Sequence, residues 1–301
     1  MKKLLTALTA LLVIFVSCTN TDKAATRLLQ FNLQKGKTYV YDLDGSMKQE
    51  VMGRSSDINI ASTYKIDVTG ENETSKTLQV TYDRFRMAFD MAGVQAEVDT
   101  DKPMPAQTLA DGKPNPAYMM SQVFAGIKGK SFTMQVDKSG NVTSVSGMEE
   151  VIKTMVANSA ADESQKMQME MSLRDQLNED NIREQFGMVF NIYPGKEVKA
   201  GDSWDKTFQM GGKMAGNYTS KYKVKDVKGD KVDLEVSTDI SQEKKDSTMA
   251  VDMKGLQTGT LTVDSRTGLV ENAVYNQDIT VKNADFTVAI KGKYNITGKE
   301  K

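Results

Sequence analysis

Histidine is absent from the 301 residues of this chain, and cysteine occurs once. Histidine is the side chain that titrates near neutral pH without perturbation, and it is the commonest metal ligand in proteins. Its absence therefore excludes Ser-His-Asp and Cys-His nucleophilic catalysis, together with zinc and iron sites that depend on imidazole. A single cysteine excludes a disulfide within the chain. Sites built from two carboxylates, from a Ser-Lys pair or from carboxylate-bound Mg²⁺ or Ca²⁺ remain open.

Net charge and long apolar runs are also scarce. The formal net charge is −1, from 39 basic and 40 acidic residues. A charge of that size attracts no nucleic acid. Residues 4–16 form the one long apolar run, and it is shorter than the about 20 residues that a membrane-spanning helix requires.

The N-terminal segment has the layout of an export signal. Two lysines precede the apolar run, which ends at the small Ser17, directly before Cys18. The stretch FVSC at residues 15–18 resembles a bacterial lipobox, in which the signal is removed before the cysteine and the thiol carries a diacylglycerol. The resemblance implies a signal peptide over residues 1–17 and a lipidated Cys18. Two or three acyl chains anchor a protein stably, because each buried CH₂ contributes ~0.8 kcal/mol. An ordinary secretory signal with an incidental cysteine is the alternative.

Residues 18–27 are small and polar and are interpreted as a tether between the lipid and the fold. Surface-exported lipoproteins of some bacteria carry a cluster of acids after the cysteine, whereas here Asp22 is the only acid in the residues that directly follow. We therefore expect a location in the cell envelope, lipid-anchored in the outer membrane and facing the periplasm.

Alternation of apolar and polar residues predicts antiparallel strands over most of the chain. The alternation changes phase by one residue between 78–82 and 85–91, which predicts a β-bulge near Arg84. The stretch from Pro103 to Pro116 holds four of the five prolines and is predicted to be a surface loop.

A helical pattern separates two strand-rich regions. Apolar residues recur at helical spacing from Met148 to Met155 and from Ile182 to Phe190. Ser146 and Glu149 have the spacing of a capping box.

The strand-rich regions share short sequences in the same order, such as Lys35–Tyr39 with Ala200–Trp204. This order predicts an internal repeat, although antiparallel hairpins in general look alike. The fold class expected is mainly β (α+β), with two related antiparallel β units, as curved sheets or half-barrels, joined by a helical insert. The expected boundaries are 28–146 for the first β unit, 147–191 for the helical insert and 192–301 for the second β unit.

No group of residues stands out as a catalytic or metal centre. The methionines between Met167 and Met171 resemble the clusters of periplasmic copper proteins. On a helix, however, Met169 points away from the other two, so methionine is interpreted as adaptable apolar filler. The acids of residues 42–45, Asp137 and Asp264 are interpreted as turn residues. We expect no catalytic residue, no cofactor and no metal ion.

The segment FNIYPGKEVKAGDSW, residues 190–204, resembles an uncharacterised family of envelope lipoproteins from Bacteroidota-type bacteria. In that family a helix ends in an aromatic-Pro step before a Gly-Asp-Ser-Trp strand start. The resemblance implies location and fold and supplies no activity. Here the motif is interpreted as a turn that leads Trp204 into the core.

Three classes of function remain open. We favour a non-catalytic binding module for an apolar ligand or an envelope protein, over a structural envelope protein and over a His-independent hydrolase. Curved sheets can present an apolar trough, and flexible methionines tolerate varied acyl chains. The alternative of equal weight is that these side chains pack the sheets against the helices. The methionines expected near concave faces are Met87, Met91, Met119, Met120 and Met134.

Substitution Cys18→Ala tests the anchor. Without the thiol there is no lipidation, so the protein should leave the membrane fraction and appear in the soluble fraction after carbonate washing. Retention of the variant in washed membranes would show that the lipoprotein interpretation is wrong.

Overall fold

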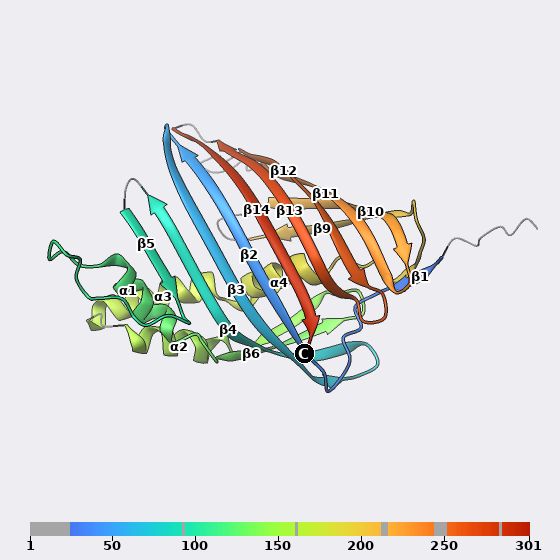
Figure 1. The fold of residues 1–301 in the computed structure, drawn as a ribbon, viewed down its shortest axis with the longest axis horizontal. Coiled ribbons are helices and arrows are strands. Elements are labelled where there is room, and N and C mark those ends of the chain that lie inside the picture. Colours follow the sequence, from blue (N-terminus) through green and yellow to red (C-terminus); the bar gives the residue numbers. More distant parts are fainter. Residues whose placement is uncertain (1–24, 92–93, 160–161, 212–215, 244–251, 283–284) are drawn as a thin grey trace, which may run out of the picture.

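The computed structural model describes residues 25–91, 94–159, 162–211, 216–243, 252–282 and 285–301, so Cys18 lies outside the described residues. Most of the described chain forms long antiparallel strands in one curved sheet, with helices on one side (Figure 1). The predicted mainly β fold, with curved antiparallel sheet and helices between strand-rich regions, is confirmed.

Strands occupy both ends of the described chain, and most of the helices lie between them. In chain order, the strands are β1 (Arg27–Leu29), β2 (Thr38–Val51), β3 (Arg54–Glu71), β4 (Ser75–Met91), β5 (Val94–Asp99), β6 (Ser131–Asp137), β7 (Val142–Ser146), β8 (Lys196–Val198), β9 (Ser203–Met210), β10 (Gly216–Lys228), β11 (Lys231–Glu243), β12 (Asp252–Asp264), β13 (Leu269–Lys282) and β14 (Thr287–Glu300). The helices are α1 (Pro116–Ala125), α2 (Met148–Asn158), α3 (Glu163–Gln176) and α4 (Glu179–Phe190).

The first and last long strands join the two strand-rich regions. The sheet runs β7-β6-β4-β3-β2-β14-β13-β12-β11-β10-β9, with β5 paired to β4. Strand β14 pairs with β2 over thirteen positions, from Val288 opposite Val51 to Glu300 opposite Tyr39. The two β regions are therefore halves of one continuous sheet, and its centre is the pairing of β2 with β14.

Matching turns open the two halves. Gly36 N–H donates to Val68 O, and Gly201 N–H donates to Val224 O, both at 2.9 Å. The short strands that precede these turns, β1 and β8, pair with each other. The internal repeat itself stays a prediction, which superposing residues 30–145 on residues 192–300 would test.

Helix α4 bridges the two edges of the sheet. It contacts edge strand β7 at one side and edge strand β9 at the other. Beside β9, the Glu184 carboxylate accepts from Gly211 N–H at 2.7 Å, and just after the helix the Ile192 carbonyl accepts from the Trp204 indole at 2.9 Å. Because the sheet curves around the helix, the apolar side chains of the concave face and of α4 meet in one core.

Local predictions had mixed outcomes. The register of β3 with β4 passes from Thr63 opposite Arg84 to Tyr64 opposite Tyr82, so the predicted bulge is confirmed, with Asp83 as the extra residue. The capping box at Ser146 is wrong, because Ser146 is still paired in β7 and Gly147, with φ of 93°, is the residue before α2.

Helix α1 is absent from the sequence-based expectations, although Asn115 and Pro116 carry a helix-start signal. The Asn115 side chain accepts from Ala117 N–H at 3.0 Å, and Pro116 occupies the first turn, where its missing N–H costs nothing. The predicted proline-rich loop therefore ends where α1 begins.

Gly140 fixes how α4 ends against the sheet. Its φ is +83°, and a Cβ at this position would lie 1.7 Å from the Phe190 carbonyl oxygen. Gly195 also has a positive φ, of +67°, but a Cβ there would meet no atom within 4 Å. We expect Gly195→Ala to lower the free energy of unfolding by about 1–2 kcal/mol, the cost of left-handed backbone alone. Gly140→Ala should lower it by clearly more, because the backbone must also move. Urea unfolding measures both values, and equal losses of unfolding free energy in the two variants would contradict the close approach of Gly140 to the Phe190 carbonyl.

Candidate ligand cavity

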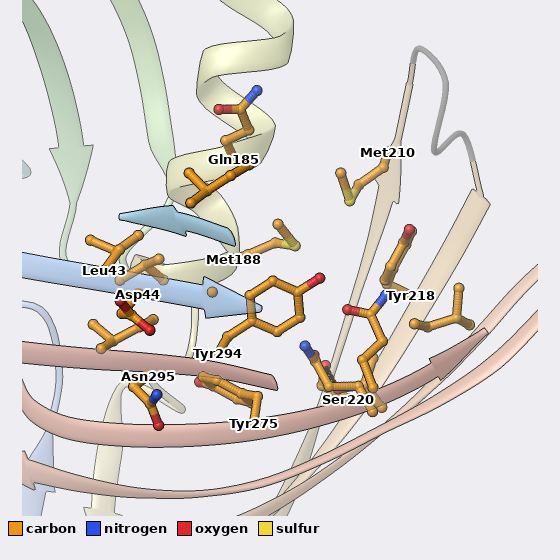
Figure 2. A pocket seen from close by; sticks show the side chains of 18 of the residues that line it. Leu43, Asp44, Gln185, Met188, Met210, Tyr218, Ser220, Tyr275, Tyr294 and Asn295 are labelled. Atoms are coloured by element: carbon orange, nitrogen blue, oxygen red, sulfur yellow. Dashed lines mark hydrogen bonds between the residues drawn. The ribbon is translucent and has the colours of Figure 1, made fainter. Parts of the chain in front are cut away.

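A cavity of about 420 Å³ lies between one part of α4, at Gln185, Met188 and Val189, and the concave face of the sheet. This volume lies within the range of about 300–1,000 Å³ that is typical of small-molecule sites. Figure 2 shows side chains from the helix and from both halves of the sheet around the space. The lining residues are Leu43, Asp44, Gly45, Ile60, Ser62, Tyr64, Gln185, Met188, Val189, Phe208, Met210, Tyr218, Ser220, Tyr222, Thr238, Ile240, Gln257, Tyr275, Gln277, Tyr294, Asn295 and Ile296.

The cavity has a deep floor and a solvent-facing mouth. Ser220 and Thr238, on β10 and β11, are only 2% and 3% exposed. Ile60 on β3 and Met188 on α4 are 41% and 38% exposed. A ligand would therefore enter between α4 and β3 and reach toward β10 and β11.

Two tyrosine rings lie on the sheet where facing positions are glycine. A Cβ at position 45 would lie 2.9 Å from Tyr294 Cδ1, and a Cβ at position 259 would lie 2.6 Å from Tyr275 Cδ1. Gly45 and Gly259 thus leave the space that these rings use. Tyr294 extends from β14 into the cavity on the side of Met188, and Met210 lies farther from the ring on β9 (Figure 2).

A band of uncharged polar side chains crosses the floor. Ser220 lies directly opposite Thr238, Thr238 opposite Gln257, and Gln257 opposite Gln277, so the band spans β10 to β13. Ser220 and Thr238 share a hydrogen bond of 2.8 Å between their hydroxyls. Directly opposite residues in antiparallel strands point to the same face. All four side chains therefore share the concave face.

No lysine or arginine lines the cavity among the described residues. Asp44 and Asn295 are also at the cavity wall, but strand alternation turns their side chains to the convex face, because Leu43 and Ile296 next to them point inward. Lys206 on β9 is the nearest cation along the band, directly opposite Ser220. Its ammonium donates to Asn191 Oδ1 at 3.0 Å, and burial lowers its pKa.

The tyrosine hydroxyls of the cavity stay protonated over the physiological range. Burial raises the pKa of Tyr218 and of Tyr222 to about 12. Burial also raises the pKa of Tyr275 well above its usual value and raises that of Tyr294. These groups therefore offer neutral hydroxyls to a ligand.

Within the described ranges, no three His, Cys, Asp or Glu side chains gather in a way that would hold a metal ion. None of the helices in these ranges is long and apolar enough to cross a membrane.

The methionines expected to line a trough are not those of the cavity. Met188 and Met210 line it, whereas Met87, Met119, Met120 and Met134 do not. Met134 is fully buried in the core and Met119 is 61% exposed on α1. The side chain of Met91 lies outside the described part of the chain. Met87 does share the concave face, directly opposite Ile60.

The interpretation of Met167 and Met171 as core filler is wrong, because both are largely exposed on α3, which has no buried residue. The turn interpretation of Asp137 and Asp264 is confirmed. Asp137 Oδ1 accepts from Ser139 N–H at 2.8 Å, and Asp264 Oδ1 accepts from Arg266 N–H at 2.9 Å.

The turn interpretation of residues 42–45 is wrong. These residues lie inside β2, which is paired on both sides, and the hairpin turn comes at Met52 and Gly53. An Asp-Gly pair predicts a hairpin only where the flanking strands end, and here the alternation of apolar residues continues through it.

Sequence reasoning missed the polar band, although a signal was present. Thr238 interrupts the apolar series between Val236 and Ile240, and Gln277 interrupts it between Tyr275 and Ile279. A polar residue on the apolar face of several neighbouring strands is the pattern that could have located the floor.

The family of unknown function DUF6263 matches residues 73–270. This match covers more than half of the chain, so the chain belongs to that family. The matched range includes α4, β9, β10, β11 and β12, which contribute one side of the cavity. No curated protein sequence matches the chain.

Similar solved structures share only a distant likeness. One is described as lipid-protein interactions in lipovitellin, with a TM-score of 0.47 and 11% identity over 89% of this chain and 25% of that chain. This chain thus spans about a quarter of the lipovitellin chain. Two others are the β domain of the Bordetella autotransporter BrkA and the translocator domain of the autotransporter NalP from Neisseria meningitidis. The BrkA domain has a TM-score of 0.26 and 7% identity, over 87% of this chain and 99% of that chain. The NalP domain has a TM-score of 0.28 and 7% identity, over 88% of each chain. Scores this low carry no argument about function.

The buried Tyr222 hydroxyl predicts a particular dependence of stability on pH. Its pKa is about 12 in the folded chain, against about 10 when unfolded, so folding favours the protonated form. This stability is present below about pH 10 and is lost as the pH rises toward 12, by about 1.4 kcal/mol per pH unit.

The free energy of unfolding of the wild type should therefore fall relative to that of Tyr222→Phe as the pH rises from about 10 to about 12, because phenylalanine has no hydroxyl to ionise. Urea unfolding at several pH values measures this difference. A difference that stays constant would mean that the hydroxyl is not buried.

Proposed function

We propose that this member of a family of unknown function is a non-catalytic binding protein that holds an apolar ligand between α4 and the concave face of its sheet. The observation that carries the proposal is the cavity of about 420 Å³ within the apolar layer of the fold. Its walls include Phe208, Ile240 and Val189 from three different elements.

The walls of the cavity favour an apolar occupant. The cavity opens to solvent at its mouth, and water beside its apolar walls finds few hydrogen-bond partners. An apolar ligand that displaces this water gains about 25 cal/mol for each Å² of apolar surface that is removed from water.

Flexible methionine side chains on the wall opposite the floor favour a ligand of variable shape. Met188 on α4 and Met210 on β9 are unbranched thioethers that fill irregular spaces. Both are absent from the deep floor, where Ser220 and Thr238 fix the surface. An acyl chain, which bends freely, suits such walls.

We also propose that the chain is anchored through a lipid on Cys18, in the cell envelope and facing the periplasm. The signal-like N-terminus supports this location. Arg27, the first residue of β1, follows Cys18 by nine positions, and such a tether reaches at most about 30 Å. An anchored cavity would thus remain close to membrane lipids, the most abundant apolar molecules of the envelope.

Probe binding tests the cavity directly. N-phenylnaphthylamine is uncharged and fluoresces strongly in apolar surroundings, so it should bind the wild-type chain saturably at micromolar concentration. Met188→Trp places a larger ring at the mouth and should weaken binding at least about tenfold, or about 1.4 kcal/mol.

Met171→Trp is the matched control. Met171 is 67% exposed on α3 and does not line the cavity, so this variant should bind like the wild type. Absence of saturable binding, or equal weakening by both substitutions, would contradict the proposal and leave a structural envelope protein as the better hypothesis.

A further inference from the structure

We infer that the ligand is an uncharged amphiphile, an acyl chain joined to a neutral hydrogen-bonding group such as the ester and hydroxyls of a monoacylglycerol, and that this polar group binds the band on the cavity floor. The inference rests on the proposed function and specifies the chemistry of that site.

Position in the sheet gives the first argument. The band formed by Ser220, Thr238, Gln257 and Gln277 crosses four neighbouring strands in direct register. Apolar side chains border it on both sides along the strands, with Ile240 and Ile279 toward one end and Val236 toward the other. A polar stripe within an apolar wall matches a ligand whose polar group lies within an otherwise apolar surface.

Unused hydrogen-bonding capacity gives the second argument. Within the described chain, the amides of Gln257 and Gln277 and the Tyr294 hydroxyl line the cavity, are partly exposed to solvent and have no hydrogen-bond partner in the protein. Each amide can donate two hydrogen bonds and accept two. Ester and hydroxyl oxygens of a ligand would satisfy these groups in place of water.

Absence of charge gives the third argument. No cation lines the cavity among the described residues, and Lys206, which shares the concave face at the end of the band, is directed to Asn191, to which it donates at 3.0 Å. A carboxylate on the floor would lose its hydration without an opposite charge, which strongly disfavours a buried anion. A neutral headgroup meets no such penalty.

Competition with the fluorescent probe distinguishes the two chemistries in the wild-type chain. Laurate and monolauroylglycerol carry the same acyl chain and differ in headgroup charge at about pH 8, well above the pKa of a carboxylic acid. We expect monolauroylglycerol to displace N-phenylnaphthylamine at a concentration at least about tenfold lower than laurate. Both ligands are tested below their critical micelle concentrations.

Two variants assign the headgroup to the band. Gln257→Leu with Gln277→Leu keeps similar side-chain volume and removes the free amides, so it should bind the probe as well as the wild type while losing the preference for monolauroylglycerol. Lys206→Met should leave the competition unchanged. Thermal unfolding of each variant checks that the fold is retained, and the wild-type competition needs no variant.

The outcomes separate the two claims. Failure of the probe to bind the wild type overturns the proposed function. Probe binding with equal competition by laurate and monolauroylglycerol overturns the inference alone, because the headgroup then lies in water at the mouth. Tighter laurate binding that is lost in Lys206→Met also overturns it and identifies a fatty-acid site at Lys206.

Discussion

Pairing of β2 with β14 is the interaction on which the rest of the structure depends. These strands lie near opposite ends of the described chain, and even the paired residues that are closest in sequence, Val51 and Val288, are far apart along it. Their pairing merges two runs of antiparallel strands into one sheet. A sheet this wide twists and curls, because each strand is rotated relative to its neighbour. Its concave face is apolar and needs a cover. The helices between the two runs supply that cover, and α4 reaches both sheet edges.

Helix α4 alone is too narrow to cover the whole concave face of the sheet, and the cavity is the part that it leaves open. A helix is about 10–12 Å wide with its side chains, whereas the concave face spans many strands about 4.8 Å apart. Near the end of α4, Phe190 and Ile192 fill the space with buried side chains. Earlier in the helix, Gln185 and Met188 line an open space whose opposite wall comes from β10 to β13. Neutral hydroxyls and amides form its floor.

Sequence patterns predicted the parts of this structure that depend on neighbouring residues. The alternation in 78–91 predicted a bulge near Arg84, and the structure has it at the neighbouring Asp83. The helical spacing around Ile182 and Phe190 predicted the face of α4 that packs on the core. The pairing of β2 with β14 could not be predicted, because all the strands carry similar alternation. The wall that α4 contributes to the cavity could not be predicted either, because Met188 has the same local pattern as the exposed Met171.

Crystallography with a bromine-labelled ligand tests the central claim most directly. Monoacylglycerol with a brominated chain, soaked into crystals of the wild-type chain, gives an anomalous signal at the position of the halogen. We predict bromine peaks between α4 and the sheet, near Met188 and Met210, with the glycerol ester within hydrogen-bonding distance of Gln257 or Gln277. A cavity closed by α4 resting on the sheet, or bromine found only on outer surfaces of the molecule, would contradict it.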